Sequence, residues 1–189
     1  MAFDLEVVLR ALKPEKSTGH IRRRNDDRLR FVGPDIKDTP VMLDTSVYID
    51  RLSDRLPGEV GRLLSQSVLE HSTVALCELA HPFGRLDPEH PETATTLDAI
   101  RAAIAAISAN RLSSPSPKAV VQAGIVTGVI ARRKGLMRQD RQPMLNDATL
   151  LFHALEKGCA LLTGNVSDFD MIEQVVAVAR TRVLYYRAI

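Results

Sequence analysis

From residue 41 onward, short apolar runs alternate with longer amphipathic stretches, and this alternation is the feature that most constrains the fold. Four runs are predicted as strands, at 41–43, 73–77, 159–163 and 183–186. The stretches between these runs have the length and the apolar spacing of helices. Strands that alternate with helices predict a parallel sheet with helices on both faces. We therefore expect an α/β domain over residues 40–189.

The helices are predicted from apolar spacing, caps and breakers. Ser116 with Pro117 is a typical helix start, and Gly158 is a typical helix end. The predicted helices span 46–52, 59–70, 89–110, 116–134 and 146 or 147 to 157, with a short helix after Asp168. One assignment stays open, because the segment TVALCELA, which contains the predicted strand 73–77, fits a single helical run equally well.

Residues 1–39 differ from the rest and form a separate N-terminal extension in this prediction. Apolar residues between 3 and 12 predict a short amphipathic helix that ends near Pro14. A polar stretch with three consecutive arginines at 22–24 follows, and prolines at 34 and 40 bracket a linker. We expect a solvated arm that packs loosely on the domain. A basic arm that touches phosphates is the alternative, although Asp26 and Asp27 dilute its charge.

Composition excludes several classes of protein. The 189 residues are 45% hydrophobic and 25% charged, as in a soluble globular domain, and the net charge of +2 does not imply wholesale polyanion binding. Trp is absent, so base stacking on aromatic platforms is not expected. The apolar stretch at 119–131 is too short to span a bilayer and no signal peptide is evident, so we expect a cytoplasmic protein. Cys77 and Cys159 are expected as buried, unpaired thiols.

Four carboxylates lie at or near the ends of apolar runs: Asp44, Glu78, Asp147 and Asp168. Residues that follow parallel strands meet at one edge of the sheet, where such folds bind ligands. At about 4.5 Å and an effective dielectric constant near 20, each carboxylate pair costs roughly 3–4 kcal/mol. A divalent cation relieves that cost, and Mg²⁺ prefers oxygen ligands. The pattern therefore predicts a metal site.

Each acid also has an alternative interpretation without a metal. Asp44 precedes a predicted helix and could be its N-cap. Glu78 could lie on the solvent-exposed face of a helix, and Asp147 could be a first-turn acid that the helix dipole favours. Other chemistries are excluded: the histidines, among them His153, have no HxxxH or HExxH spacing, and no P-loop motif is present. His153 is expected to be a packed or rim residue.

Three segments resemble the PIN domain family, especially the VapC-like toxins of bacterial toxin–antitoxin pairs. They are VMLDTSVYID at 41–50, STVALCELA at 72–80 and NDATLLFHALEKGCALLTGNVSDF at 146–169. The third segment is the most specific, with an Asp that opens an apolar helix, then Gly158, a strand and Thr-x-Asn-x-x-Asp-Phe. The resemblance covers roughly residues 41–189 and implies a three-layer α/β/α PIN-like fold with a central parallel sheet.

The resemblance implies a Mg²⁺- or Mn²⁺-dependent ribonuclease. Asp44, Glu78 and Asp147 match the three most regular acidic positions of the family. Many members carry a fourth acid where this chain has Asn165, so either Asn165 or Asp168 would complete the site. Thr163 and Ser46 match small polar residues that support the acids.

The implied partners are an RNA substrate, a cognate antitoxin protein that covers the acidic pocket, and a second copy of the chain in a homodimer. A cluster of basic residues precedes Asp147, and it is as consistent with a phosphate track as with a solvated helix end: Arg132, Arg133, Lys134, Arg138 and Arg141. Two alternatives remain open: a catalytically silent PIN-like module that binds RNA or protein, suggested by Asn165, and a nuclease that acts on DNA.

Overall fold

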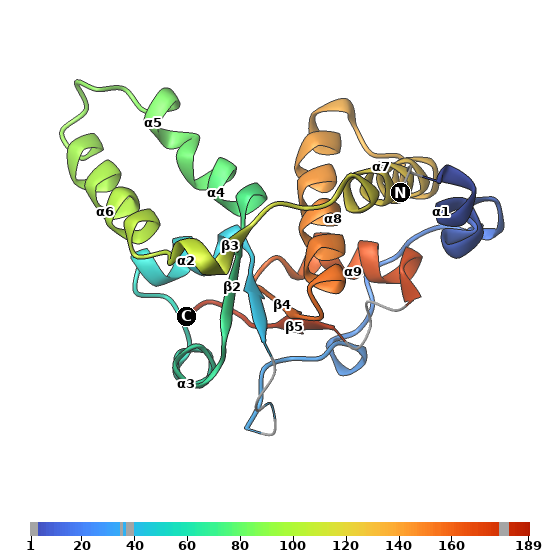
Figure 1. The fold of residues 1–189 in the computed structure, drawn as a ribbon, viewed down its shortest axis with the longest axis horizontal. Helices are drawn as coiled ribbons and strands as arrows, with labels where there is room; N and C mark the ends of the chain where they lie inside the picture. Colours follow the sequence, from blue (N-terminus) through green and yellow to red (C-terminus); the bar gives the residue numbers. More distant parts are fainter. Residues whose placement is uncertain (1–3, 35, 37–39, 178–181) are drawn as a thin grey trace.

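A parallel sheet forms the centre of the molecule (Figure 1). The computed structural model describes residues 4–34, 36, 40–177 and 182–189. Within them, five strands pair in the order β3-β2-β1-β4-β5, and every neighbouring pair is parallel. The strands are β1 Val41–Leu43, β2 Leu69–Ser72, β3 Leu112–Ser113, β4 Ala160–Thr163 and β5 Val183–Tyr185. The predicted α/β class with a parallel sheet is confirmed.

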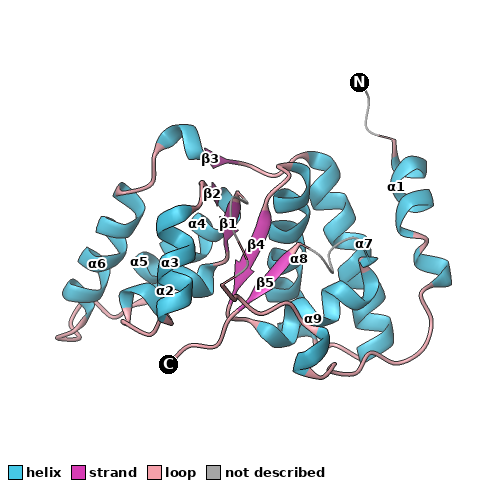
Figure 2. Ribbon diagram, turned by 90° about the horizontal axis from the view of Figure 1, so that it is seen from below, coloured by secondary structure: helices cyan, strands magenta, loops and turns pink. Residues whose placement is uncertain are grey.

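Helices cover both faces of the sheet (Figure 2). On one side lie α7 Pro117–Lys134, α8 Arg141–Glu156 and α9 Val166–Val175, joined by α1 Leu5–Leu12. On the other side lie α2 Thr45–Leu52, α3 Gly58–Gln66 and α6 Thr93–Ala105, while α4 Thr73–Ala80 and the short α5 Pro82–Arg85 lead outward from β2 to α6. This is the predicted three-layer arrangement.

The alternation of side chains along the strands divides the core into two clusters. Met42 of β1 and Leu161 of β4 pack into the cluster under α7, α8 and α9. Leu43 and Leu162, one residue later, pack into the cluster under α2 and α3. Successive side chains of a strand point to opposite faces, so each strand contributes to both clusters. A strand buried on both sides reads as a continuous apolar run, which is why β1, β4 and β5 could be predicted within one residue of their ends.

The predicted second strand at 73–77 is wrong. These residues belong to α4, as the alternative interpretation allowed, and the strand is β2, just before it. The Ser72 hydroxyl oxygen accepts a hydrogen bond from the Val74 amide at 3.2 Å and so caps α4. Only Leu69 and Glu70 of β2 were covered by a prediction, as the end of the helix at 59–70, and the sequence LEHS has no apolar pattern that would indicate a strand. Its pairing with β1 and β3, not its composition, makes it a strand.

Helix boundaries follow the local signals where these are strong. The Ser116 hydroxyl accepts a hydrogen bond from the Ala119 amide at 3.1 Å, so α7 starts as predicted. α8 starts at Arg141, earlier than expected, because a proline in the first turn needs no hydrogen-bond acceptor for its nitrogen. α9 starts at Val166, before Asp168 rather than after it. None of the described helices is long and apolar enough to cross a membrane.

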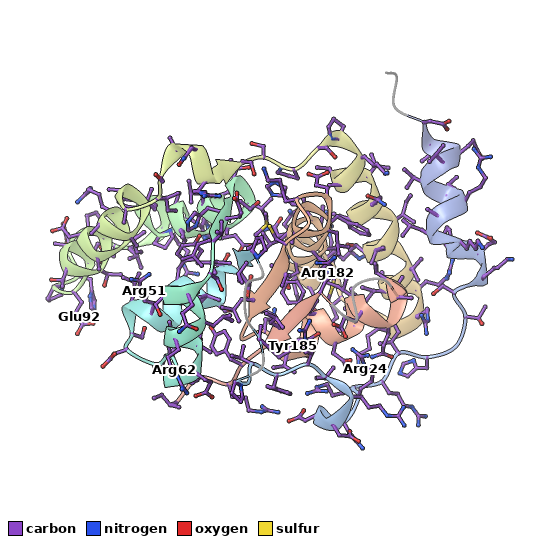
Figure 3. All side chains as sticks on the ribbon, turned by 60° about the horizontal axis from the view of Figure 1, so that its bottom comes forward. Arg24, Arg51, Arg62, Glu92, Arg182 and Tyr185 are labelled. Atoms are coloured by element: carbon purple, nitrogen blue, oxygen red, sulfur yellow. The ribbon has the colours of Figure 1, made fainter. Side chains whose placement is uncertain are left out.

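The arm, defined as residues 4–34, is part of the core. Val8 and Ile21 are 1% and 0% exposed. The Arg24 side chain forms ion pairs with Asp170 and Glu173 of α9. Figure 3 labels Arg24, near α9. The Val32 amide donates to the Tyr185 carbonyl at 2.8 Å, so the chain runs alongside β5. The expectation of a loosely packed, solvated arm is therefore wrong, and the predicted linker at 34–40 falls largely outside the described residues.

The two cysteines differ in exposure. Cys159 is buried at the start of β4, as expected, whereas Cys77 is exposed on α4. The expectation for Cys77 rested on its apolar neighbours in the sequence, and it is wrong because Cys77 lies on the exposed side of α4. His153 is fully buried, as a packed residue, and its ring nitrogens form hydrogen bonds with the Ser72 and Ser113 hydroxyls at 2.9 and 3.1 Å.

Candidate active site

Asp44 follows β1 and occupies the N-cap position of α2, but its side chain does not cap the helix. Instead its Oδ2 accepts hydrogen bonds from the hydroxyls of Ser46 at 2.6 Å and Thr163 at 2.8 Å. The N-cap interpretation is thus wrong for the side chain. Asp44 is only 4% exposed. Burial, and next to it the charge of Glu78, raise the pKa of Asp44, although the hydroxyl donors oppose this shift.

Asp147 projects from the second turn of α8 and is also buried, at 8% exposed. Its Oδ2 accepts a hydrogen bond from the Asn165 amide nitrogen Nδ2 at 3.0 Å. No described residue donates a hydrogen bond to its other oxygen, Oδ1. Burial raises the pKa of Asp147 well above its usual value, and the charges of Asp44, Asp168 and Glu78 raise it further. These influences place all four predicted acids near one another.

Glu78 reaches the same region from α4, and it is half-buried. One carboxylate oxygen accepts a hydrogen bond from the Thr45 hydroxyl, which belongs to the residue after Asp44. The other accepts one from the Asn146 amide nitrogen at 2.7 Å, and Asn146 precedes Asp147. Glu78 is therefore attached to the turns that carry both buried acids. Thr45 and Asn146 were not predicted as site residues, and their only signal in the sequence is their position beside a predicted acid.

Asn165 joins Asp147 to Asp168. Its Nδ2 donates to Oδ2 of both carboxylates, at 3.0 Å in each case. Its Oδ1 accepts a hydrogen bond from the Asp168 amide at 3.3 Å and so caps α9. Its own amide donates to the Thr163 hydroxyl at 2.9 Å. The predicted supporting residues Thr163 and Asn165 thus form one corner of the site between β4 and α9.

The acids share one region without a positive partner. None of the four forms an ion pair with any described residue. As the side chains stand, however, no three His, Cys, Asp or Glu side chains in the described part of the chain form a group that could hold a metal ion. The amides of Asn146 and Asn165 and the hydroxyls of Thr45, Ser46 and Thr163 donate hydrogen bonds to the carboxylates. That the four acids form one metal site stays a prediction, and in this structure neutral donors bind them.

The predicted basic cluster divides into two parts. Arg132 donates to the carbonyls of Pro14 and Ser17 at 2.8 and 3.0 Å, and Arg133 donates to the Gly19 carbonyl at 2.9 Å. These two arginines therefore hold the arm. The other three predicted cations are exposed and form no ion pair with a described residue: Lys134, Arg138 and Arg141.

Comparisons with known proteins identify the fold but provide no relative by sequence. No protein-family model matches the sequence, and no curated protein matches it. The structure is similar to a chain of the VapBC2 crystal structure from Rickettsia felis, bound to a DNA fragment from their promoter, with a TM-score of 0.52 and 15% identity over 78% of this chain and 98% of the other. VapBC from Salmonella typhimurium, in a DNA-bound crystal structure, matches with a TM-score of 0.49 and 16% identity over 80% and 98%. At such identity the Rickettsia match shows the fold alone, and it confirms the PIN-like, VapC-type architecture that the sequence resemblance implied.

Proposed function

We propose that this chain is a divalent-metal-dependent endoribonuclease and the toxin of a toxin–antitoxin pair. One observation carries the proposal: Asp44 and Asp147 are buried beside two further acids, and no described cation neutralises them. Burying an unpaired carboxylate is costly, so a site that keeps several of them is suited to an external cation.

The donor set fits Mg²⁺ or Mn²⁺ in its chemistry. Every candidate ligand is an oxygen atom, as these hard cations require, and no thiol or imidazole is among them. Asp44, Glu78 and Asp147 would hold the ion directly or through water, and Asp168 or Asn165 would complete the site. When bound, such an ion supplies charge relief at a phosphoryl oxygen and makes a bound water more acidic.

The surrounding residues prepare the acids for this role. Ser46 and Thr163 fix the orientation of the Asp44 carboxylate from two sides. Asn165 fixes Asp147 and Asp168 relative to each other. Asp168 is half-buried rather than buried, so it is the acid best placed to accept a hydrogen bond from a water that enters from solvent. Fixed orientation before substrate arrives lowers the reorganisation cost of the reaction.

An RNA backbone would contact the exposed cations between the end of α7 and the start of α8, at Lys134, Arg138 and Arg141. Arg132 and Arg133 are poorer candidates, because arm carbonyls already accept their hydrogen bonds. Contacts to phosphates release counterions, so RNA binding should weaken steeply as salt concentration rises. We further propose a cognate antitoxin that covers the acidic site and inserts a cation into it, a homodimer, and a cytoplasmic location. The Rickettsia match, a VapBC2 complex, supports the antitoxin partner.

Purified protein tests the proposal directly. RNA should be cleaved with Mn²⁺ or Mg²⁺, and cleavage should stop on addition of EDTA. Asp147→Asn should reduce the rate by roughly 10³-fold or more, about 4 kcal/mol of transition-state stabilisation. Asp98→Asn is the matched control, because Asp98 is an exposed acid of α6 whose side chain is 72% exposed. Equal rates for wild type and Asp147→Asn would contradict the proposed site.

A catalytically silent module is the second candidate. Asn165 stands where many PIN domains have an acid, and no three acids in the described residues are already grouped around one point. If the wild type binds RNA but does not cleave it with either metal, the silent module is the better description. Single-stranded DNA belongs in the same assay, and comparable cleavage of DNA would show that the nuclease does not require RNA.

A further inference from the structure

His153 lies on α8 at 0% exposed, and its ring connects this helix to the edge of the sheet. Its Nδ1 and Nε2 form hydrogen bonds with the hydroxyls of Ser72, at 2.9 Å, and Ser113, at 3.1 Å. These two serines are register partners at the carboxyl ends of β2 and β3. The imidazole of one α8 residue therefore spans the ends of two neighbouring strands.

Ser72 is the residue through which His153 also contacts α4. Its oxygen accepts a hydrogen bond from the Val74 amide, at 3.2 Å, as the N-cap of that helix. Burial lowers the pKa of His153, so at neutral pH the ring is uncharged and carries one proton. Ser72 is 0% exposed, and in the arrangement that gives its proton an acceptor it donates to Nδ1 while Nε2 donates to Ser113. Ser72 thus accepts from α4, donates to α8 and joins the two helices.

A second contact joins the same two helices at their other ends. Oε1 of Glu78, late in α4, accepts a hydrogen bond at 2.7 Å from the amide nitrogen of Asn146, early in α8. The two helices therefore run in opposite directions. The two contacts are six residues apart along α4 and its cap and seven residues apart along α8, or about 9 and 10 Å at the rise of an α-helix. Two contacts of nearly equal spacing thus hold α4 against α8.

We propose that His153 is a positioning residue of the acidic site, which fixes the register between α4 and α8 and so sets where Glu78 lies relative to Asp147. This inference rests on the proposed metal-dependent function. α4 has only eight residues, so a shift at its capped start moves the whole helix, including Glu78. Groups that orient a metal ligand from behind commonly contribute 10- to 100-fold to metal affinity.

Ser72→Ala removes the contact between the helices at the start of α4. Ser116→Ala is the matched control, because Ser116 caps α7 and also binds α8, through Glu156 at 2.6 Å, but neither α7 nor Glu156 supplies a candidate metal ligand. Both substitutions delete an N-cap and should lower stability to a similar extent. Mn²⁺ affinity, measured by the electron paramagnetic resonance signal of free Mn²⁺, should fall roughly 10-fold in Ser72→Ala and stay unchanged in Ser116→Ala. The kcat for RNA should change in the same way, with little change in KM.

Two substitutions of His153 itself separate positioning from stability. An Asn side chain reaches only as far as Nδ1 and can still accept from Ser72, whereas a Gln side chain reaches as far as Nε2 and can bind Ser113 instead. Asn leaves the larger cavity, so His153→Asn should be the less stable of the two variants. Because the contact with Ser72 sets the register, His153→Asn should nevertheless bind Mn²⁺ several-fold more tightly than His153→Gln.

Three results would overturn the inference: wild-type Mn²⁺ affinity in Ser72→Ala, an equal loss of affinity in Ser72→Ala and Ser116→Ala, or Mn²⁺ affinities of the two His153 variants that follow their stabilities. All three leave the proposed function intact. A wild-type protein that neither binds Mn²⁺ nor cleaves RNA overturns the proposed function and this inference together.

Discussion

Two groups of buried acids in this molecule have different kinds of partner. Asp170 and Glu173 of α9 are 0% and 2% exposed, and Arg24 from the arm forms ion pairs with both. Asp44 and Asp147 are nearly as buried, at 4% and 8% exposed, yet only hydroxyls and amides donate to their side chains.

The difference separates a structural role from a functional one. A buried ion pair holds two parts of a chain together, and here the pairs of Arg24 with Asp170 and Glu173 join the arm to α9. Neutral donors stabilise a carboxylate less than a cation does, so they do not cancel the rise that burial causes in the pKa values of Asp44 and Asp147. Carboxylates whose pKa values are raised in this way are typical of functional sites, among them sites that bind a cation.

The largest effect is expected at the paired group. Arg24→Ala should lower the free energy of unfolding by about 3–5 kcal/mol, because it leaves buried Glu173 without its cation and leaves buried Asp170 with only the longer contact to Arg23, at 3.8 Å. Urea denaturation at neutral pH measures this change. Arg101→Ala is the control, since exposed Arg101 pairs with exposed Asp98 and lies over the Phe83 ring, and its effect should be small. A comparable loss of unfolding free energy in the two variants would show that the buried ion pairs of Arg24 stabilise the protein no more than the exposed pair of Arg101.

Mn²⁺ should distinguish the two groups. At a free concentration 100 times the dissociation constant, a bound ion stabilises the folded state by about 2.7 kcal/mol. We expect this gain for the wild type and for Arg24→Ala, and its loss in Asp147→Asn. Thermal unfolding with and without Mn²⁺ measures the gain. Equal gains in all three proteins would place the ion away from Asp147.

The smallest expected effect is a change in stability whose sign differs between the two groups of acids. Asp147→Asn should raise the stability of the metal-free protein at neutral pH by roughly 1–3 kcal/mol, because one of several like charges is removed. A matched substitution in the paired group, Asp170→Asn, should lower stability instead, since it weakens the contact with Arg24. Urea denaturation of both variants measures the two signs. If Asp147→Asn is destabilising as well, repulsion among the four acids is weaker than we infer.

The difference in stability between the wild type and Asp147→Asn should depend on pH. The pKa of Asp147 in the folded state is raised well above its model-compound value of 3.8, chiefly by burial, so the folded state binds a proton more tightly than the unfolded state does. The free energy of unfolding of the wild type should therefore fall, relative to that of Asp147→Asn, as pH rises from about 3.8 through the raised pKa, and should change no further above it. Urea denaturation of both proteins across this pH range measures the two free energies. A wild type that gains stability relative to Asp147→Asn as pH rises would contradict the assignment.

Sequence prediction succeeded where the signal is local. Ser116 and Gly158 marked helix ends, and the apolar runs at β1, β4 and β5 marked buried strands. It failed at β2, because the sequence LEHS becomes a strand only by pairing with β1 and β3. It also failed for the arm, because the composition of residues 22–24 does not show that Arg24 has two buried acids as partners.

The sequence by itself determined the class of fold, because buried strands and amphipathic helices leave local patterns, and it singled out four acids as candidates. Only the tertiary structure decided which groups contact those acids. The contacts of Asn146 and Thr45 with Glu78 join residues 68 and 33 positions apart. No local pattern encodes such contacts, because they depend on how the helices pack against the sheet.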